Sequence, residues 1–139
     1  MRALLDTWVL VERYKRNPEA ISVLEASGKK FEAVISLISI AELVNVISRE
    51  YGEREARVQY AHLIRLPLVR SGVTDEIAKD AGLYKTKYKF SLAAAVILAT
   101  AVEVSAQLIV TGGERQFEEE WKNVEEIDIM KLTDFTRTI

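Results

Sequence analysis

The chain has 139 residues and a formal net charge of −2, which fits one domain and gives no general attraction for nucleic acid. Hydrophobic residues make up 49% and charged residues 29%, a balance typical of a soluble globular protein with a real core. The absence of cysteine and the single histidine, His62, exclude disulfides, thiol catalysis and histidine-rich metal sites. No apolar run is long enough to span a bilayer and no signal peptide is visible, so we expect a cytoplasmic protein without membrane contact.

Short apolar runs alternate with helical patterns along the first half of the chain. Residues 3–5 form a brief apolar run that ends at Asp6, which predicts a buried strand. Pro18 opens a helical stretch that continues through Leu24. Residues 33–35 include two β-branched side chains and predict a second strand.

Two amphipathic helices are predicted next. Ser39 is the expected N-cap of the first, whose apolar residues recur with helical spacing at positions 40, 43, 44 and 47. The second covers residues 56–64, and residues 67–69 predict a third strand.

The second half of the chain contains one segment that is apolar on every side. Residues 91–102 have Thr100 as their only polar side chain after Ser91, the expected N-cap, so we expect a helix buried on nearly all sides. The other elements are a helix over 74–84, a strand over 108–110, a short polar helix over 114–121 and an alternating strand over 127–130.

The alternation of short strands with helices, without a tight hairpin signal, predicts the fold class. We expect a three-layer α/β/α sandwich around a short parallel β-sheet, formed by residues 1–139 as a single domain. In such folds, sites form beyond the carboxyl ends of the strands. This rule points to Asp6, directly after the first strand, and to residues 111–114, directly after a later one.

Four segments resemble, in the right order, the four motifs of the PIN-domain family. They are MRALLDTWVLV at 1–11, SIAEL at 39–43, SLAAAVILATA at 91–101 and LIVTGG at 108–113. Each is weak alone, but together they are specific and cover almost the whole chain. The resemblance is to VapC-type toxins in particular, and it implies RNA cleavage with Mg²⁺ or Mn²⁺ held by carboxylates.

The chain departs from these motifs at three positions. Trp8 stands where the family has Asn, and Ala94 and Gly113 stand where it has Asp, so two of four acidic positions remain. The resemblance implies that the remaining two, Asp6 and Glu42, are the catalytic and metal-binding residues.

Glu114 is a third candidate ligand. It follows the missing fourth-motif Asp, and the two preceding glycines make the backbone permissive, so its side chain could reach back toward Asp6. Alternatively, Glu114 only stabilises the N-terminus of its helix. Thr111 and Ser91 would supply nearby hydroxyls.

Several residues keep more than one interpretation. Helical periodicity alone places Glu42 on a solvated face, and only the resemblance makes that face the wall of a cleft. For Trp8 there are three interpretations. Its side chain packs into the core, it fills the space that a substrate phosphate would need, or it offers a ring on which an unpaired base stacks. Two basic runs contact phosphates or are simply solvated. These runs are Arg13, Lys15 and Arg16, and Lys79, Lys85, Lys87 and Lys89.

Two functions follow from the resemblance. The first is a VapC-like endoribonuclease with weak or absent activity, which binds one Mg²⁺ or Mn²⁺ weakly, forms a homodimer and is held by a cognate antitoxin. The second is an inactive PIN module that binds RNA, an antitoxin or another PIN chain. The helices before Pro67 are the candidate dimer surface because they are amphipathic.

Overall fold

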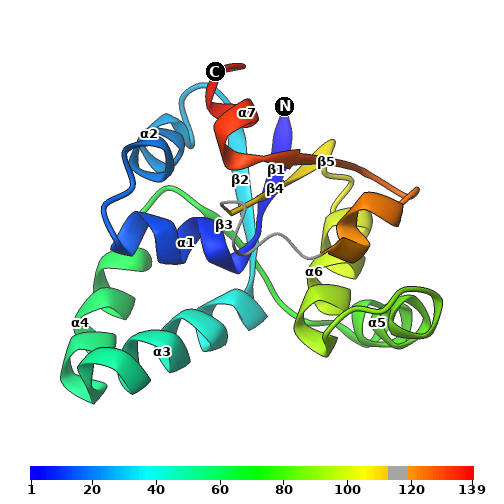
Figure 1. Cartoon of the computed structure of the whole chain (residues 1–139), viewed down its shortest axis with the longest axis horizontal. Helices are drawn as coiled ribbons and strands as arrows, with labels where there is room; N and C mark the ends of the chain where they lie inside the picture. Colours follow the sequence, from blue (N-terminus) through cyan, green and yellow to red (C-terminus); the bar gives the residue numbers. More distant parts are fainter. Residues whose placement is uncertain (113–118) are drawn as a thin grey trace.

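Five strands pair side by side, all parallel, in the order β3-β2-β1-β4-β5. The computed structural model describes residues 1–112 and 119–139 (Figure 1). The strands are β1 (Arg2–Leu5), β2 (Glu32–Ser36), β3 (Val69–Ser71), β4 (Leu108–Thr111) and β5 (Asp128–Lys131). Parallel neighbours need long crossover connections, and helices supply them on both faces of the sheet.

Helices form the two outer layers. They are α1 (Thr7–Tyr14), α2 (Pro18–Ala26), α3 (Leu37–Tyr51), α4 (Glu53–Leu63), α5 (Asp75–Lys87), α6 (Leu92–Glu103), the 3-10 helix η2 (Glu119–Asn123) and α7 (Leu132–Thr136). Residues of β1 alternate between two buried clusters: Ala3 and Leu5 pack with α1 to α4 and α7, whereas Leu4 packs with α5, α6 and Trp121. The α/β/α sandwich predicted from the sequence is therefore confirmed.

Helix α6 has the environment that its composition predicted. Every residue from Ala94 to Ala101 is buried, and Ser91 is the N-cap. The one polar side chain in that stretch, Thr100, donates to the carbonyl of Val96 at 2.7 Å, so its hydroxyl is satisfied within the helix. No helix in the described part of the chain is both long and apolar enough to cross a bilayer.

Three local predictions need correction. The N-cap of α3 is Ser36, not Ser39, because the Ser36 hydroxyl accepts from the Ile38 amide at 3.2 Å. Strand β3 begins at Val69, where the predicted strand ended, since Pro67 has no N–H for a strand ladder. Helices α1 and α7 were not predicted. Much of the polar helix predicted at 114–121 lies outside the described residues, and η2 covers its described end.

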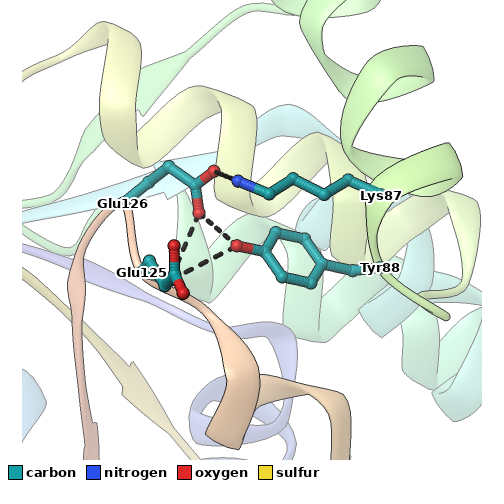
Figure 2. Close-up of polar contacts among 4 residues, drawn as sticks. All are labelled: Lys87, Tyr88, Glu125 and Glu126. Carbon is teal, nitrogen blue, oxygen red and sulfur yellow. Dashed lines mark hydrogen bonds and ion pairs between the residues drawn. The ribbon is translucent and has the colours of Figure 1, made fainter.

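A polar network connects the end of α5 to the loop before β5 (Figure 2). The Lys87 ammonium donates to Glu126 Oε2 at 2.8 Å, and the Tyr88 hydroxyl donates to Glu126 Oε1 at 2.5 Å. The backbone amide of Glu125 donates to the same hydroxyl at 3.3 Å. Burial by itself would raise the pKa of Glu126, but the hydrogen bonds from Lys87 and Tyr88 outweigh it and lower that pKa. The bond to Glu126 raises the pKa of Lys87.

We expect Glu126→Gln to reduce the free energy of unfolding at pH 7, because the ion pair with Lys87 is lost and the hydrogen bond from Tyr88 no longer ends on a charged group. The folded-state pKa of Glu126 lies below its ordinary 4.5, so its stabilisation is present above pH 4.5 and disappears as pH falls through the lowered value. The pKa of Lys87 lies above its ordinary 10.5, so that contribution is present below pH 10.5 and disappears as pH rises through the raised value.

Urea unfolding of wild type and Glu126→Gln from pH 3 to pH 7 measures this difference, which should shrink toward low pH. Glu119→Gln is the matched control, since Glu119 is 85% exposed in its pair with Lys122 and should change stability by less than about 0.5 kcal/mol. Equal losses in the two variants would show that the network stabilises the fold no more than an exposed ion pair does.

Candidate functional site

Three helix N-termini meet at the carboxyl edge of the sheet. Helix α1 follows β1 after one residue and α3 follows β2 directly, while α6 leads back into β4 and so begins at the same edge. The Asp6 amide donates to the Val110 carbonyl at 2.9 Å, which sets Asp6 beside Thr111 at the ends of neighbouring strands. This edge is where open parallel sheets form their sites.

Asp6 is held at the first of these helix ends. Its side chain is the N-cap of α1 and accepts from the Thr7 amide at 2.7 Å. The residue is only 6% exposed. A buried carboxylate at this place is favoured by the positive end of the helix dipole. The predicted position of Asp6, directly after the first strand, is correct.

Thr7 joins the two remaining acidic residues. Its Oγ1 lies 2.5 Å from Glu42 Oε1 and 2.9 Å from Ser39 Oγ. A carboxylate is only an acceptor, so Thr7 gives its single hydroxyl proton to Glu42, and Ser39 donates to Thr7. Thr7 thus contacts Asp6 through its amide and Glu42 through its hydroxyl.

Glu42 is half-buried and faces this cluster. Helical periodicity alone placed it on a solvated face, which was misleading, because its carboxylate contacts Thr7 of a neighbouring helix. The sequence reasoning missed Thr7 and misassigned Ser39, which is fully buried in the first turn of α3. The available signal was the hydroxyl that follows Asp6 and the one that precedes Glu42 by three residues.

Thr111 carries an unsatisfied buried hydroxyl at the end of β4. It is fully buried, and its Oγ1 has no hydrogen-bond partner among the residues that the structure describes. Leaving such a group unpaired costs about 1–3 kcal/mol, so it indicates a partner such as water or a bound ion. Its position beside Asp6 makes it part of the same site.

Trp8 packs against Gly112, just beyond Thr111. A Cβ added at Gly112 would lie 2.6 Å from Trp8 Cβ, so only glycine fits the observed backbone. Trp8 is half-buried against the core cluster, which is the core-packing interpretation of this residue.

Ala94 occupies the start of α6 at the same edge. Its amide donates to Ser91 Oγ at 3.2 Å, so Ser91 serves as a cap, and Ala94 itself is 5% exposed. No three His, Cys, Asp or Glu side chains come together as a metal site within residues 1–112 and 119–139. Gly113 and Glu114 lie outside the described residues, so the predicted ligand role of Glu114 stays a prediction.

The described donors fit at most one divalent cation. Asp6 and Glu42 provide two carboxylates, which balance the charge of one Mg²⁺ or Mn²⁺, and the unpartnered Thr111 hydroxyl lies in the same region. These oxygen atoms are the ligand type that hard cations prefer, with water completing the coordination.

Comparison with known proteins identifies the class. The family model of the PIN domain matches residues 3–120, so the chain belongs to the PIN-domain family. No curated protein sequence matches the chain.

Several solved structures share the fold of VapC-type toxins with this chain. VapBC2 from Rickettsia felis, bound to a DNA fragment from its promoter, matches with 18% identity, 94% of this chain, 98% of that one and a TM-score of 0.75. DNA-bound VapBC from Salmonella typhimurium matches with 15% identity, 95% and 98% coverage and a TM-score of 0.73. Mycobacterium tuberculosis VapC20, described as a Sarcin-Ricin loop cleaving toxin, matches with 15% identity, 87% and 93% coverage and a TM-score of 0.66.

Proposed function

We propose that this chain is a VapC-type toxin domain that binds RNA at the Asp6–Glu42 edge and cleaves it weakly or not at all. The observation that carries the proposal is the cluster in which Thr7 holds both carboxylates beside the Thr111 hydroxyl, which has no partner within residues 1–112 and 119–139. Two acidic groups beside a buried hydroxyl that lacks a partner among the described residues suit a hydrated cation better than a purely structural contact.

Asp6 and Glu42 would hold one Mg²⁺ or Mn²⁺, with Glu114 as a proposed further ligand. Such an ion lowers the pKa of bound water and stabilises the leaving oxygen when RNA is cleaved. The chain's own contribution is positional: Thr7 fixes the Glu42 carboxylate, and the helix cap fixes Asp6. The absence of an acidic group at Ala94 argues against a second ion, and losing several kcal/mol of transition-state stabilisation slows cleavage about a thousandfold or more.

Calorimetric titration with Mn²⁺ tests the site directly. Wild type is expected to bind one equivalent weakly, and Asp6→Asn, which keeps the size of the side chain and its ability to cap α1, is expected to abolish binding. Asp128→Asn is the matched control, because Asp128 is an exposed carboxylate on β5. Absence of saturable binding by wild type at millimolar Mn²⁺ would overturn the metal site and favour the inactive module.

Partners follow from the same family. The solved Rickettsia felis and Salmonella typhimurium relatives are VapBC assemblies, and we propose that this chain likewise pairs with a cognate antitoxin in the cytoplasm. We also propose a homodimer. Three large hydrophobic side chains are exposed on or next to α4, before Pro67, and they support that surface: Val58, Tyr60 and Ile64.

The second candidate function is an inactive PIN module that binds RNA, an antitoxin or another PIN chain. The buried methyl group of Ala94 favours it, because that group lines the edge with apolar surface. Cleavage of a labelled RNA in Mn²⁺, compared between wild type and Glu42→Gln, separates the two candidates. Cleavage lost in the variant supports the first, and the same background in both proteins supports the second.

A further inference from the structure

A second polar site lies at the other end of α1 and α3 from the acidic residues. A cavity of about 960 Å³ opens between the C-terminal ends of α1 and α3 and the sides of α2 and α4. The size lies in the range of about 300–1,000 Å³ that is usual for ligand sites. We call this cavity the basic pocket.

The basic pocket gathers positive charge in a chain whose net charge is −2. Arg13, Lys15, Arg16 and Lys29 line it. None of these four cations makes an ion pair with another described residue, in contrast to paired surface cations such as that of Lys79. Two carboxylates, Glu25 and Glu55, also line the pocket, so positive charge remains in excess.

Two tyrosine rings form part of the wall. Tyr14 and Tyr51 meet edge to face with ring centroids 5.6 Å apart. The Tyr14 hydroxyl donates to Glu55 Oε1 at 3.4 Å. This hydrogen bond orients the Tyr14 ring and gives one of the two pocket carboxylates a partner. Tyr51 is 59% exposed, so it offers a ring face next to the cations. Aromatic rings beside cations are the combination that binds unpaired nucleotides.

Arg16 adds an independent observation, because its backbone is strained. Helix α1 ends in a Schellman motif, with Arg16 N bonded to Arg13 O and Asn17 N bonded to Glu12 O, each at 2.9 Å. Arg16 occupies the left-handed position of this motif with φ 63°, where glycine is the usual residue. A strained arginine without an ion-pair partner in the described chain points to a role in binding rather than in stability.

We propose that the basic pocket binds the phosphate backbone of single-stranded RNA and that a base stacks on Tyr51. This inference rests on the proposed RNA partner and deepens it. Helix α1 has eight residues, so the pocket lies about 12 Å along the helix from the Asp6 end. One strand of a few nucleotides reaches both places, and the pocket anchors it while its neighbouring segment lies at the acidic edge.

Fluorescence anisotropy with a labelled single-stranded oligouridylate of about ten nucleotides tests the pocket, in EDTA so that metal plays no part. With four phosphate contacts, the logarithm of wild-type affinity should fall with the logarithm of salt concentration with a slope of about −3. Arg13→Gln/Lys29→Gln should weaken binding about tenfold or more and bring the slope to about −1.4. Arg70→Gln/Lys79→Gln removes the same charge from β3 and α5 and should change affinity by less than about twofold.

Arg16→Gly distinguishes binding from folding. Glycine relieves the strain, so the melting temperature should rise while RNA affinity falls. A fall in affinity together with a lower melting temperature would contradict the assignment of Arg16.

Each remaining outcome also decides the proposal. If the pocket double variant and the control double variant bind RNA with equal affinity, RNA does not bind in the basic pocket. The proposed RNA binding at the acidic edge would be unaffected by that result. Absence of wild-type RNA binding at low salt would overturn the inference, and binding of labelled polyglutamate instead would assign the pocket to an acidic peptide. Because EDTA is present, failure of the Asp6 metal site leaves these results unaffected.

Discussion

Ala94→Asp is expected to strengthen Mn²⁺ binding about tenfold or more relative to wild type. Ala94 lies in the first turn of α6, where the Ser91 cap and the helix dipole favour a carboxylate. The new group would bring a third acidic ligand to the edge that carries Asp6 and Glu42. Without metal, the added buried charge should lower the free energy of unfolding by about 1–3 kcal/mol, because carboxylates in one site repel each other.

Calorimetry and thermal unfolding with and without Mn²⁺ measure the two effects. Saturating metal should stabilise the variant more than wild type, since tighter binding to the folded state shifts unfolding further. The control is Ala93→Asp, which adds the same charge one residue earlier in the same turn but on a different side of the helix. A similar gain in Ala93→Asp would show that general charge, and not a completed ligand set, causes the effect.

Gly112→Ala is expected to destabilise the protein by about 1–3 kcal/mol, because the new methyl group would lie 2.6 Å from Trp8 Cβ and also 3.2 Å from the Trp8 carbonyl carbon. Neither atom is the end of a flexible side chain, so the backbone must move. Since Asp6 begins the same helix as Trp8, we also expect weaker Mn²⁺ binding in this variant.

Gly82→Ala is the matched control for this substitution. Gly82 lies inside α5 with no atom within 4 Å of an added Cβ, so the change should stabilise the helix by about 0.5–1 kcal/mol. Urea unfolding of both variants measures the opposite signs. Stabilisation by Gly112→Ala would mean that Trp8 and Gly112 are not in close contact.

The three buried strands β1, β2 and β4 could be predicted almost to the residue, because buried parallel strands are continuous apolar runs, whereas the exposed edge strand β3 could not. The runs at 3–5, 33–35 and 108–110 all lie within observed strands. Helix α1 could not be predicted in the same way. Its eight residues continue directly from β1 with more apolar side chains, and the sequence contains no sign of the break except Asp6.

The start of α3 shows where local patterns stop being decisive. Ser36 and Ser39 both precede apolar residues and both have the chemistry of an N-cap. Ser36 caps the helix, whereas Ser39 is buried against Thr7, a contact between residues 32 positions apart. Such a choice depends on the tertiary structure, which outweighs local preference.

The site could be predicted in part, and for two different reasons. Asp6 follows from a general rule about the ends of parallel strands. Glu42 followed only from the family motif, because its environment depends on how α3 packs beside α1. The unpartnered Thr111 hydroxyl depends on burial, and no sequence pattern shows that a hydroxyl lacks a partner.

The position of β1 at the centre of the sheet has a consequence for synthesis on the ribosome. Its edges pair with β2 and with β4, and the β4 partner of Ala3 is Leu108. One edge of the first strand therefore stays open until more than a hundred further residues have been made. Asp6 is positioned through the carbonyl of Val110, so the acidic edge is completed only late in translation.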